Sequence, residues 1–200
     1  MQSLNHRTLY HMILAGANEV ISREQELNAI NVFPVPDGDT GTNLAHLMRM
    51  IVREVNSSRS SSEVLDSIKR ACLRGSRGNS GMIFSQFIIS MCNYMSDRAE
   101  LNHTQFIEMC EQSAAKSRSS VHEPKDGTVL SIMDDWVYIL KEALALSEGV
   151  SELLRRSFAE VCVSLENTKH QLEELRKYNV VDAGAKGFVH FLQGFIFSLE

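Results

Sequence analysis

The residues that could do chemistry gather in segment 36–43, which reads Pro-Asp-Gly-Asp-Thr-Gly-Thr-Asn. Asp37 and Asp39 stand two residues apart, so on an irregular backbone both carboxylates can point at one cation. Carboxylate oxygens are hard ligands that select Mg²⁺ or Ca²⁺, and Mg²⁺ usually takes phosphate oxygens as further ligands. A calcium loop is excluded, because Thr42 stands where that loop needs glycine and Met48 where it needs glutamate. The segment is therefore either a magnesium–phosphate site or a pair of turn and helix-capping aspartates.

Three further glycine-containing stretches also precede segments with helical patterns, at residues 75–81, 126–128 and 182–187. A helix N-terminus offers free N–H donors and the positive end of the helix dipole, and glycine lets the backbone approach a ligand closely. Together these features suit phosphate. The GxxxxGK[ST] and GxGxxG motifs are absent, which excludes a P-loop kinase and a Rossmann enzyme. Arg77 and Lys186 lie in two of these stretches, and each could contact either phosphate or solvent.

Helices must position these stretches, because the breaking residues are few and concentrated: the chain has 11 glycines and 3 prolines. Apolar residues at helical spacing fill the segments between them; the clearest stripe is Leu44, Leu47, Met48 and Ile51. We predict about eight helices, over residues 3–22, 43–56, 60–72, 80–95, 104–110, 128–144, 150–177 and 185–199.

Local signals mark several helix boundaries. Ser60 and Glu63 form a capping box, and Thr104 and Thr128 are candidate N-caps. Residues 57–62 and 115–120 are polar linkers. Residues 31–36 have a strand-like composition, but two prolines remove backbone donors, so we predict an extended loop and no strand. The expected fold is all-α, in a single domain over residues 1–200.

Composition excludes several classes of protein. The net charge of −5 over 200 residues is not the excess of basic residues that is typical of a nucleic-acid-binding protein. The sequence contains no run of 18 apolar residues, so no transmembrane helix is predicted. The first residues lack a signal-peptide profile. The four cysteines are far apart in apolar stretches, so we expect reduced core thiols in a cytoplasmic protein.

Four motifs, taken together, resemble a known family. They are NVFPVPDGDTGTNL (31–44), GSRGNSG (75–81), DGTVLS (126–131) and VVDAGAKG (180–187). In order and spacing they are similar to the DhaL-like kinase domain over about residues 5–198. The resemblance is closest to the N-terminal, ATP-binding domain of bacterial fatty acid kinase, and more distant to the ATP-binding subunit of dihydroxyacetone kinase.

The resemblance implies a closed barrel of about eight antiparallel helices with the nucleotide at one end. Asp37 and Asp39 become the catalytic metal ligands, holding two Mg²⁺ ions against ATP, and Asn31 lies near the place of a third metal ligand. The implied nucleotide contacts are Thr40, Gly41, Thr42, Asn43, Gly78, Asn79, Ser80, Gly81, Asp126, Gly127, Thr128, Asp182 and Gly184. Ala185 and Lys125 depart from the family's usual residues, which affects purine and ribose contacts and leaves the metal loop untouched.

The implied activity is an ATP-dependent kinase that phosphorylates the carboxylate of a fatty acid. A separate DegV-type lipid-binding protein presents the acid, and the product is an acyl phosphate. A dihydroxyacetone kinase-type subunit and a nucleotide-binding regulatory module without turnover stay open as alternatives, as does a homodimer. The family's central and C-terminal regions are missing from the sequence, so we expect a fragment of a longer kinase, with a short stand-alone protein as the alternative.

Overall fold

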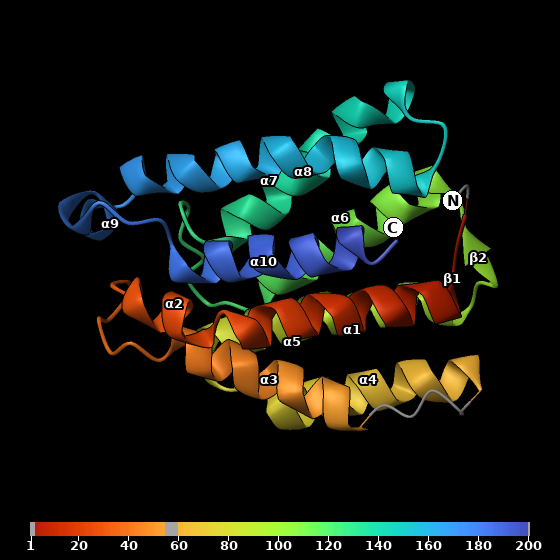
Figure 1. Ribbon diagram of the computed structural model, residues 1–200, viewed down its shortest axis with the longest axis horizontal. Coiled ribbons are helices and arrows are strands. Elements are labelled where there is room, and N and C mark those ends of the chain that lie inside the picture. Colours follow the sequence, from red (N-terminus) through yellow and green to blue (C-terminus); the bar gives the residue numbers. More distant parts are fainter. Residues whose placement is uncertain (1–2, 55–59, 200) are drawn as a thin grey trace.

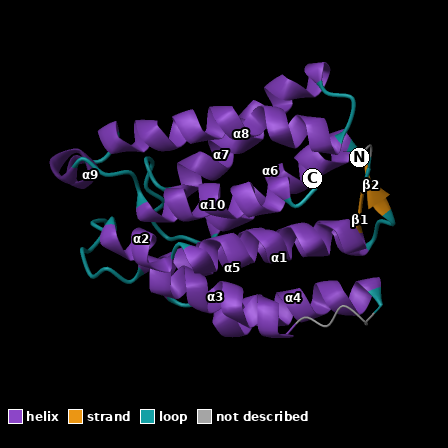
Figure 2. Ribbon diagram, viewed as in Figure 1, coloured by secondary structure: helices purple, strands orange, loops and turns teal. Residues whose placement is uncertain are grey.

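Eight long helices run side by side along the molecule in the computed structural model, which describes residues 3–54 and 60–199 (Figures 1 and 2). They are α1 (His6–Ser22), α3 (Thr40–Glu54), α4 (Ser61–Gly75), α5 (Gly78–Ser96), α6 (His103–Ser119), α7 (Val129–Ala143), α8 (Val150–Asn167) and α10 (Ala183–Phe197). Two short helices, α2 (Glu24–Ala29) and α9 (Glu173–Tyr178), and two 3₁₀ turns, Leu144–Leu146 and Thr168–His170, complete the described helical structure. The all-α class predicted from the sequence is confirmed.

Each long helix packs against the next along the chain, and α10 packs back against α1, so the contacts form a closed ring. Neighbours in this ring run in opposite directions (Figure 1). As a result, α3, α5, α7 and α10 all begin at the same end of the molecule. This is the end at which the glycine-containing stretches predicted from the sequence come together.

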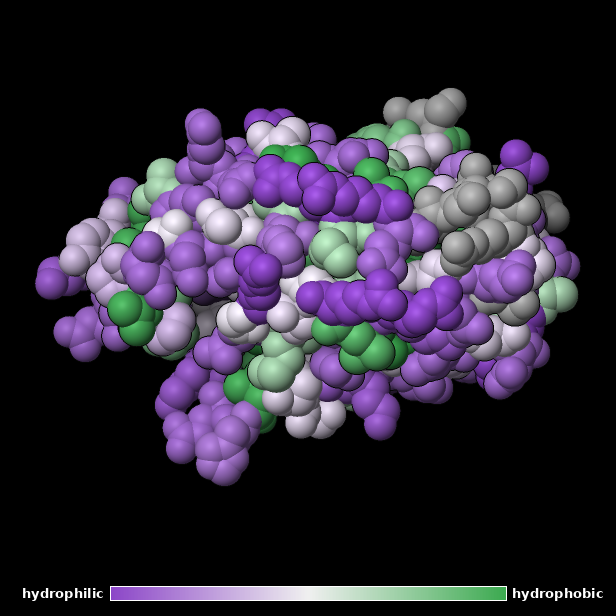
Figure 3. Space-filling model, turned by 90° about the horizontal axis from the view of Figure 1, so that it is seen from below, coloured by the Kyte–Doolittle hydropathy of each residue, from purple (hydrophilic) through white to green (hydrophobic). Residues whose placement is uncertain are grey.

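The apolar stripes are buried between the helices, as their spacing predicts. On α3, Leu44, Leu47 and Met48 have no exposed surface. Trp136 on α7 is also fully buried, with the ring of Phe188 edge-on at 5.8 Å between ring centroids. The face formed by α3 and α4 is mostly hydrophilic, with small separated apolar patches (Figure 3). This division is what amphipathic helices around one core produce.

Two short strands correct the prediction of an all-helical chain. Leu4–Asn5 (β1) pairs antiparallel with Glu100–Leu101 (β2), with Leu4 opposite Leu101. Two residues are too few for the alternating pattern that marks a strand in sequence. This strand pair links the segment before α1 to the segment before α6.

Several helix boundaries also differ from the prediction. The region 150–177 is not one helix: α8 ends at Asn167, and a 3₁₀ turn separates it from α9. The N-cap of α6 is Asn102 and not Thr104, since the Asn102 side chain accepts a hydrogen bond from the Gln105 N–H at 2.9 Å. The cap at Thr128 is confirmed.

The remaining predictions about the scaffold have mixed outcomes. The capping box of Ser60 and Glu63 is present at the start of α4, and part of the linker predicted over 57–62 lies outside the described residues. The linker predicted over 115–120 is wrong, because α6 continues to Ser119. The cysteines are unpaired, and all are buried except the half-buried Cys162. No helix among the described residues is long and apolar enough to span a bilayer.

Candidate active site

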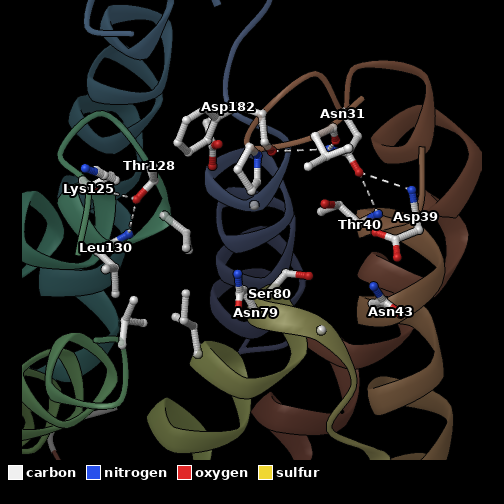
Figure 4. A pocket seen from close by; sticks show the side chains of 18 of the residues that line it. Asn31, Asp39, Thr40, Asn43, Asn79, Ser80, Lys125, Thr128, Leu130 and Asp182 are labelled. Atoms are coloured by element: carbon white, nitrogen blue, oxygen red, sulfur yellow. Dashed lines mark hydrogen bonds between the residues drawn. The ribbon is translucent and has the colours of Figure 1, made fainter. Parts of the chain in front are cut away.

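A cavity of about 520 Å³ lies where α3, α5, α7 and α10 begin (Figure 4). Its walls are the first residues of those helices, the loop before α3 and part of the loop before α7. The lining residues are Asn31, Phe33, Pro34, Val35, Asp37, Asp39, Thr40, Asn43, Gly78, Asn79, Ser80, Ile83, Val121, Glu123, Lys125, Thr128, Val129, Leu130, Asp182 and Gly184. Four helix N-termini around one cavity present the positive ends of their helix dipoles, an environment that favours an anion.

The two aspartates of the loop are exposed at this cavity. Asp37 and Asp39 both line it, and neither carboxylate accepts a hydrogen bond from a described residue. They therefore fit Mg²⁺, which binds through one or two protein carboxylates and fills its other positions with water and phosphate oxygens. Among the described residues, no three His, Cys, Asp or Glu side chains gather into a complete protein-only metal site.

Asn31 holds this loop from the inside. Its Oδ1 accepts hydrogen bonds from the backbone N–H groups of Asp39 (3.1 Å) and Thr40 (2.9 Å). The Asn31 side chain thus caps α3, and the Asp39 side chain does not cap it. The oxygen that would have to face a metal is engaged with two N–H donors, so the structure favours a structural role for Asn31 over the ligand role expected from the sequence.

The first turns of α3 and α5 form one polar wall of the cavity. Asn43 on α3 faces Gly78 at the start of α5, where a Cβ would lie 2.8 Å from the Asn43 Nδ2 atom. Gly78 also has a φ of +61°, which favours glycine. Asn79 and Ser80 follow it on the same wall, whereas the preceding Arg77 is exposed and does not line the cavity.

The start of α10 contributes a buried carboxylate. Asp182 caps this helix by accepting a hydrogen bond from the Ala185 N–H at 2.7 Å, and its own N–H donates to Thr168 Oγ1 at 3.1 Å. Burial raises the pKa of Asp182 to about 6, although N–H groups of Ala185, Val129 and Gly184 oppose this rise. This carboxyl therefore ionises at a higher pH than an exposed aspartate does.

The start of α7 forms the opposite wall. Thr128 caps the helix by accepting a hydrogen bond from the Leu130 N–H at 3.4 Å, and its hydroxyl donates to the Lys125 carbonyl at 2.7 Å. With Ile83 and Val121, Leu130 makes this side of the cavity apolar. The cavity is thus polar near the aspartate loop and apolar on the far side.

Five of the expected nucleotide contacts do not line the cavity: Gly41, Thr42, Gly81, Asp126 and Gly127. The Asp126 side chain is 86% exposed and pairs with Arg118 at 3.3 Å. Lys186 is likewise absent from the cavity and pairs with Glu26 at 2.5 Å.

Sequence reasoning missed nine lining residues, most of them apolar: Phe33, Pro34, Val35, Ile83, Val121, Glu123, Lys125, Val129 and Leu130. Some lie within or beside the four motifs, so their positions pointed to the site although their residue types did not. Ile83 and Val121 have no such signal, because an apolar residue on a cavity wall and one in the core give the same pattern.

Comparison with known proteins identifies the family. A family profile described as the DAK2 domain matches residues 34–197. The chain belongs to the DAK2 domain family. The Bacillus subtilis (strain 168) protein YloV is 33% identical over 205 residues, covering all of this chain and 36% of YloV. An uncharacterised Staphylococcus aureus (strain USA300) protein is 31% identical over 202 residues, covering all of this chain and 37% of that protein. This DAK2 domain thus spans just over a third of the curated relatives it matches.

Solved structures share the fold. The dihydroxyacetone kinase of C. freundii in its native form superposes with a TM-score of 0.71 at 16% identity, over 95% of this chain and 34% of that chain. The same kinase in complex with AMP-PNP and Mg²⁺ gives a TM-score of 0.69 at 16% identity, covering 95% and 33%. The resemblance to the DhaL-like domain predicted from the motifs is confirmed.

Proposed function

We propose that this DAK2 domain binds Mg·ATP and transfers its γ-phosphoryl group to the carboxylate of a fatty acid. The observation that carries the proposal is the meeting of four helix N-termini with two free carboxylates, Asp37 and Asp39, at one cavity. Its volume of about 520 Å³ lies within the ordinary range for small-molecule sites. The AMP-PNP and Mg²⁺ bound by the C. freundii kinase support the same pair of ligands here.

The polar and apolar halves of the cavity suit different parts of a nucleotide. N–H groups at the start of α5, with the side chains of Asn43, Asn79 and Ser80, would hold phosphate oxygens. The apolar wall at Leu130 would accept the base. Asp37 and Asp39 would hold the metal, as one or two ions. Bound Mg²⁺ neutralises charge on the phosphates and keeps them in line for transfer.

The acceptor needs no proton removed, because a fatty acid carboxylate is already ionised at neutral pH. A carboxylate oxygen attacks the γ-phosphorus, the bond from phosphorus to the β,γ-bridging oxygen breaks, and the products are an acyl phosphate and ADP. The chain then has to position ATP and the acid and to stabilise the charge that develops during transfer. Beside the aspartate loop, the rim of Phe33, Pro34 and the 57% exposed Val35 is apolar, which suits a DegV-type lipid-binding protein that presents the acid.

A thermal-shift experiment tests the nucleotide site. At ATP about 100-fold above its Kd, Mg·ATP should stabilise the fold by about 2.7 kcal/mol, a rise in Tm of about 5–10 °C. Asp37→Ala or Asp39→Ala should abolish the rise that depends on Mg²⁺. An unchanged rise in either variant would contradict the proposed site.

A phosphotransfer assay tests the acceptor. With ATP, Mg²⁺ and a fatty acid on a DegV-type carrier, hydroxylamine should trap the acyl phosphate as a hydroxamate. Transfer to short ketoses instead would indicate a dihydroxyacetone kinase-type activity. Nucleotide binding without transfer to either acceptor would indicate a regulatory module.

A further inference from the structure

Asn31 uses its whole amide group to hold the aspartate loop. Besides accepting hydrogen bonds from Asp39 and Thr40, it donates from Nδ2 to the carbonyls of Phe33 (3.3 Å) and Val35 (3.4 Å). The residue is only 5% exposed. One buried side chain therefore ties the apolar rim on one side of the loop to the start of α3 on the other.

Asn28 acts in the same way one turn earlier in the chain. Its Oδ1 accepts a hydrogen bond from the Thr42 N–H at 3.0 Å, and its Nδ2 donates to Thr42 Oγ1 at 2.9 Å. Asn28 lies on α2 and does not line the cavity. It is therefore placed to hold α3 without touching a ligand in that cavity.

The two amides satisfy three N–H groups at the start of α3, those of Asp39, Thr40 and Thr42. Such groups are commonly capped by the side chain of the residue that precedes the helix, and aspartate is a favoured cap. Here that residue is Asp39. Because neutral amides from α2 and its following loop do the capping, both carboxylates of the loop stay free at the cavity.

We propose that Asn28 and Asn31 form an amide clamp, positioning residues that fix the start of α3 so that Asp37 and Asp39 face a bound Mg²⁺ ion. The clamp deepens the proposed function and rests on it for the identity of the metal. Residues that orient metal ligands from behind commonly change metal affinity by about 10–100-fold when they are removed.

The test compares Asn28→Ala and Asn31→Ala with Asn102→Ala. Asn102 is a matched control, because its amide caps α6 at the opposite end of the molecule. At a fixed AMP-PNP concentration, the Mg²⁺ concentration needed for half-maximal binding is measured by calorimetry. We expect it to rise about tenfold or more in both clamp variants and to stay unchanged in the control.

Amide hydrogen exchange without any ligand supplies a second readout. Exchange at Asp39 and Thr40 should accelerate in Asn31→Ala, and exchange at Thr42 should accelerate in Asn28→Ala. A raised Mg²⁺ requirement in Asn31→Ala alone would make Asn31 a direct ligand and overturn the clamp, as would unchanged exchange in both variants. A wild-type chain that binds no nucleotide with Mg²⁺ would overturn the proposed function, and the exchange rates would still decide the clamp.

Discussion

Replacing Gly41 with alanine tests whether close packing of α2 on α3 builds the site. Gly41 is the second residue of α3, and a Cβ there would lie 2.1 Å from the Glu24 carbonyl oxygen and 2.7 Å from Asn28 Oδ1. Real Cβ contacts essentially never fall below 3.0 Å, so the two helices would have to separate by about 0.9 Å. That movement breaks the Asn28–Thr42 hydrogen bonds.

The cost follows from these contacts. Overpacking costs about 1–3 kcal/mol, and each lost hydrogen bond costs about 1 kcal/mol. Alanine offsets about 1 kcal/mol through its higher helix propensity. We therefore expect Gly41→Ala to destabilise the fold by about 2–4 kcal/mol, which lowers Tm by about 4–16 °C.

Thermal and urea unfolding followed by far-ultraviolet circular dichroism measure this change. Gly81→Ala is the matched control, because Gly81 lies in the first turn of α5 and the nearest atoms to its Cβ are 3.7 Å away. The control should be as stable as the wild type or slightly more stable. A Gly41→Ala variant with wild-type stability, or an equal loss in both variants, would refute the argument from packing.

Three other expectations follow from buried groups and the cavity. Since burial raises the pKa of Asp182 from 3.8 to about 6, the folded chain holds a proton between these pH values that the unfolded chain has lost, so stability falls as pH rises through this window. Asp182→Asn should therefore be more stable than the wild type at pH ~8, by up to about 3 kcal/mol, with the difference gone near pH ~4; a constant difference in urea unfolding would contradict this. Ser157→Ala leaves the buried Trp136 Nε1–H without its partner at 3.1 Å, and it should cost about 1–3 kcal/mol in thermal unfolding; no loss would mean that another acceptor replaces Ser157. Chelating Mg²⁺ with EDTA should remove most of the rise in Tm given by ATP, and a persistent rise would show that nucleotide binding does not need the metal.

Local patterns were enough to predict the eight long helices, although not all of their ends, and to point to the aspartate segment that lines the candidate cavity. The apolar stripe of α3 and the run of glycines, aspartates and threonines after Pro36 are signals within one short segment, and both lie where predicted. Asp37, Asp39 and Asn43 meet Asn79 and Ser80 at one cavity because the antiparallel helix order brings the starts of α3 and α5 to the same end.

Contacts between segments explain what the sequence did not reveal. Asn28 reaches Thr42 across 14 residues, and no spacing rule links the two. Gly41 belongs to segment 36–43, which the sequence predicts to bind phosphate, but it faces α2 and not the cavity. The direction in which a helix residue points depends on which neighbouring helix packs against it. The Asp126 side chain likewise does not line the cavity, because it pairs with Arg118.

The most direct measurement is a crystal structure of this DAK2 domain with AMP-PNP and Mn²⁺ in place of Mg²⁺, so that anomalous scattering locates the metal. The account predicts metal at about 2.1 Å from carboxylate oxygens of Asp37 and Asp39, bridged to phosphate oxygens at the starts of α3 and α5. Metal bound to Asn31 Oδ1 would contradict the clamp. Nucleotide bound outside the cavity, or metal away from both aspartates, would contradict the central claim.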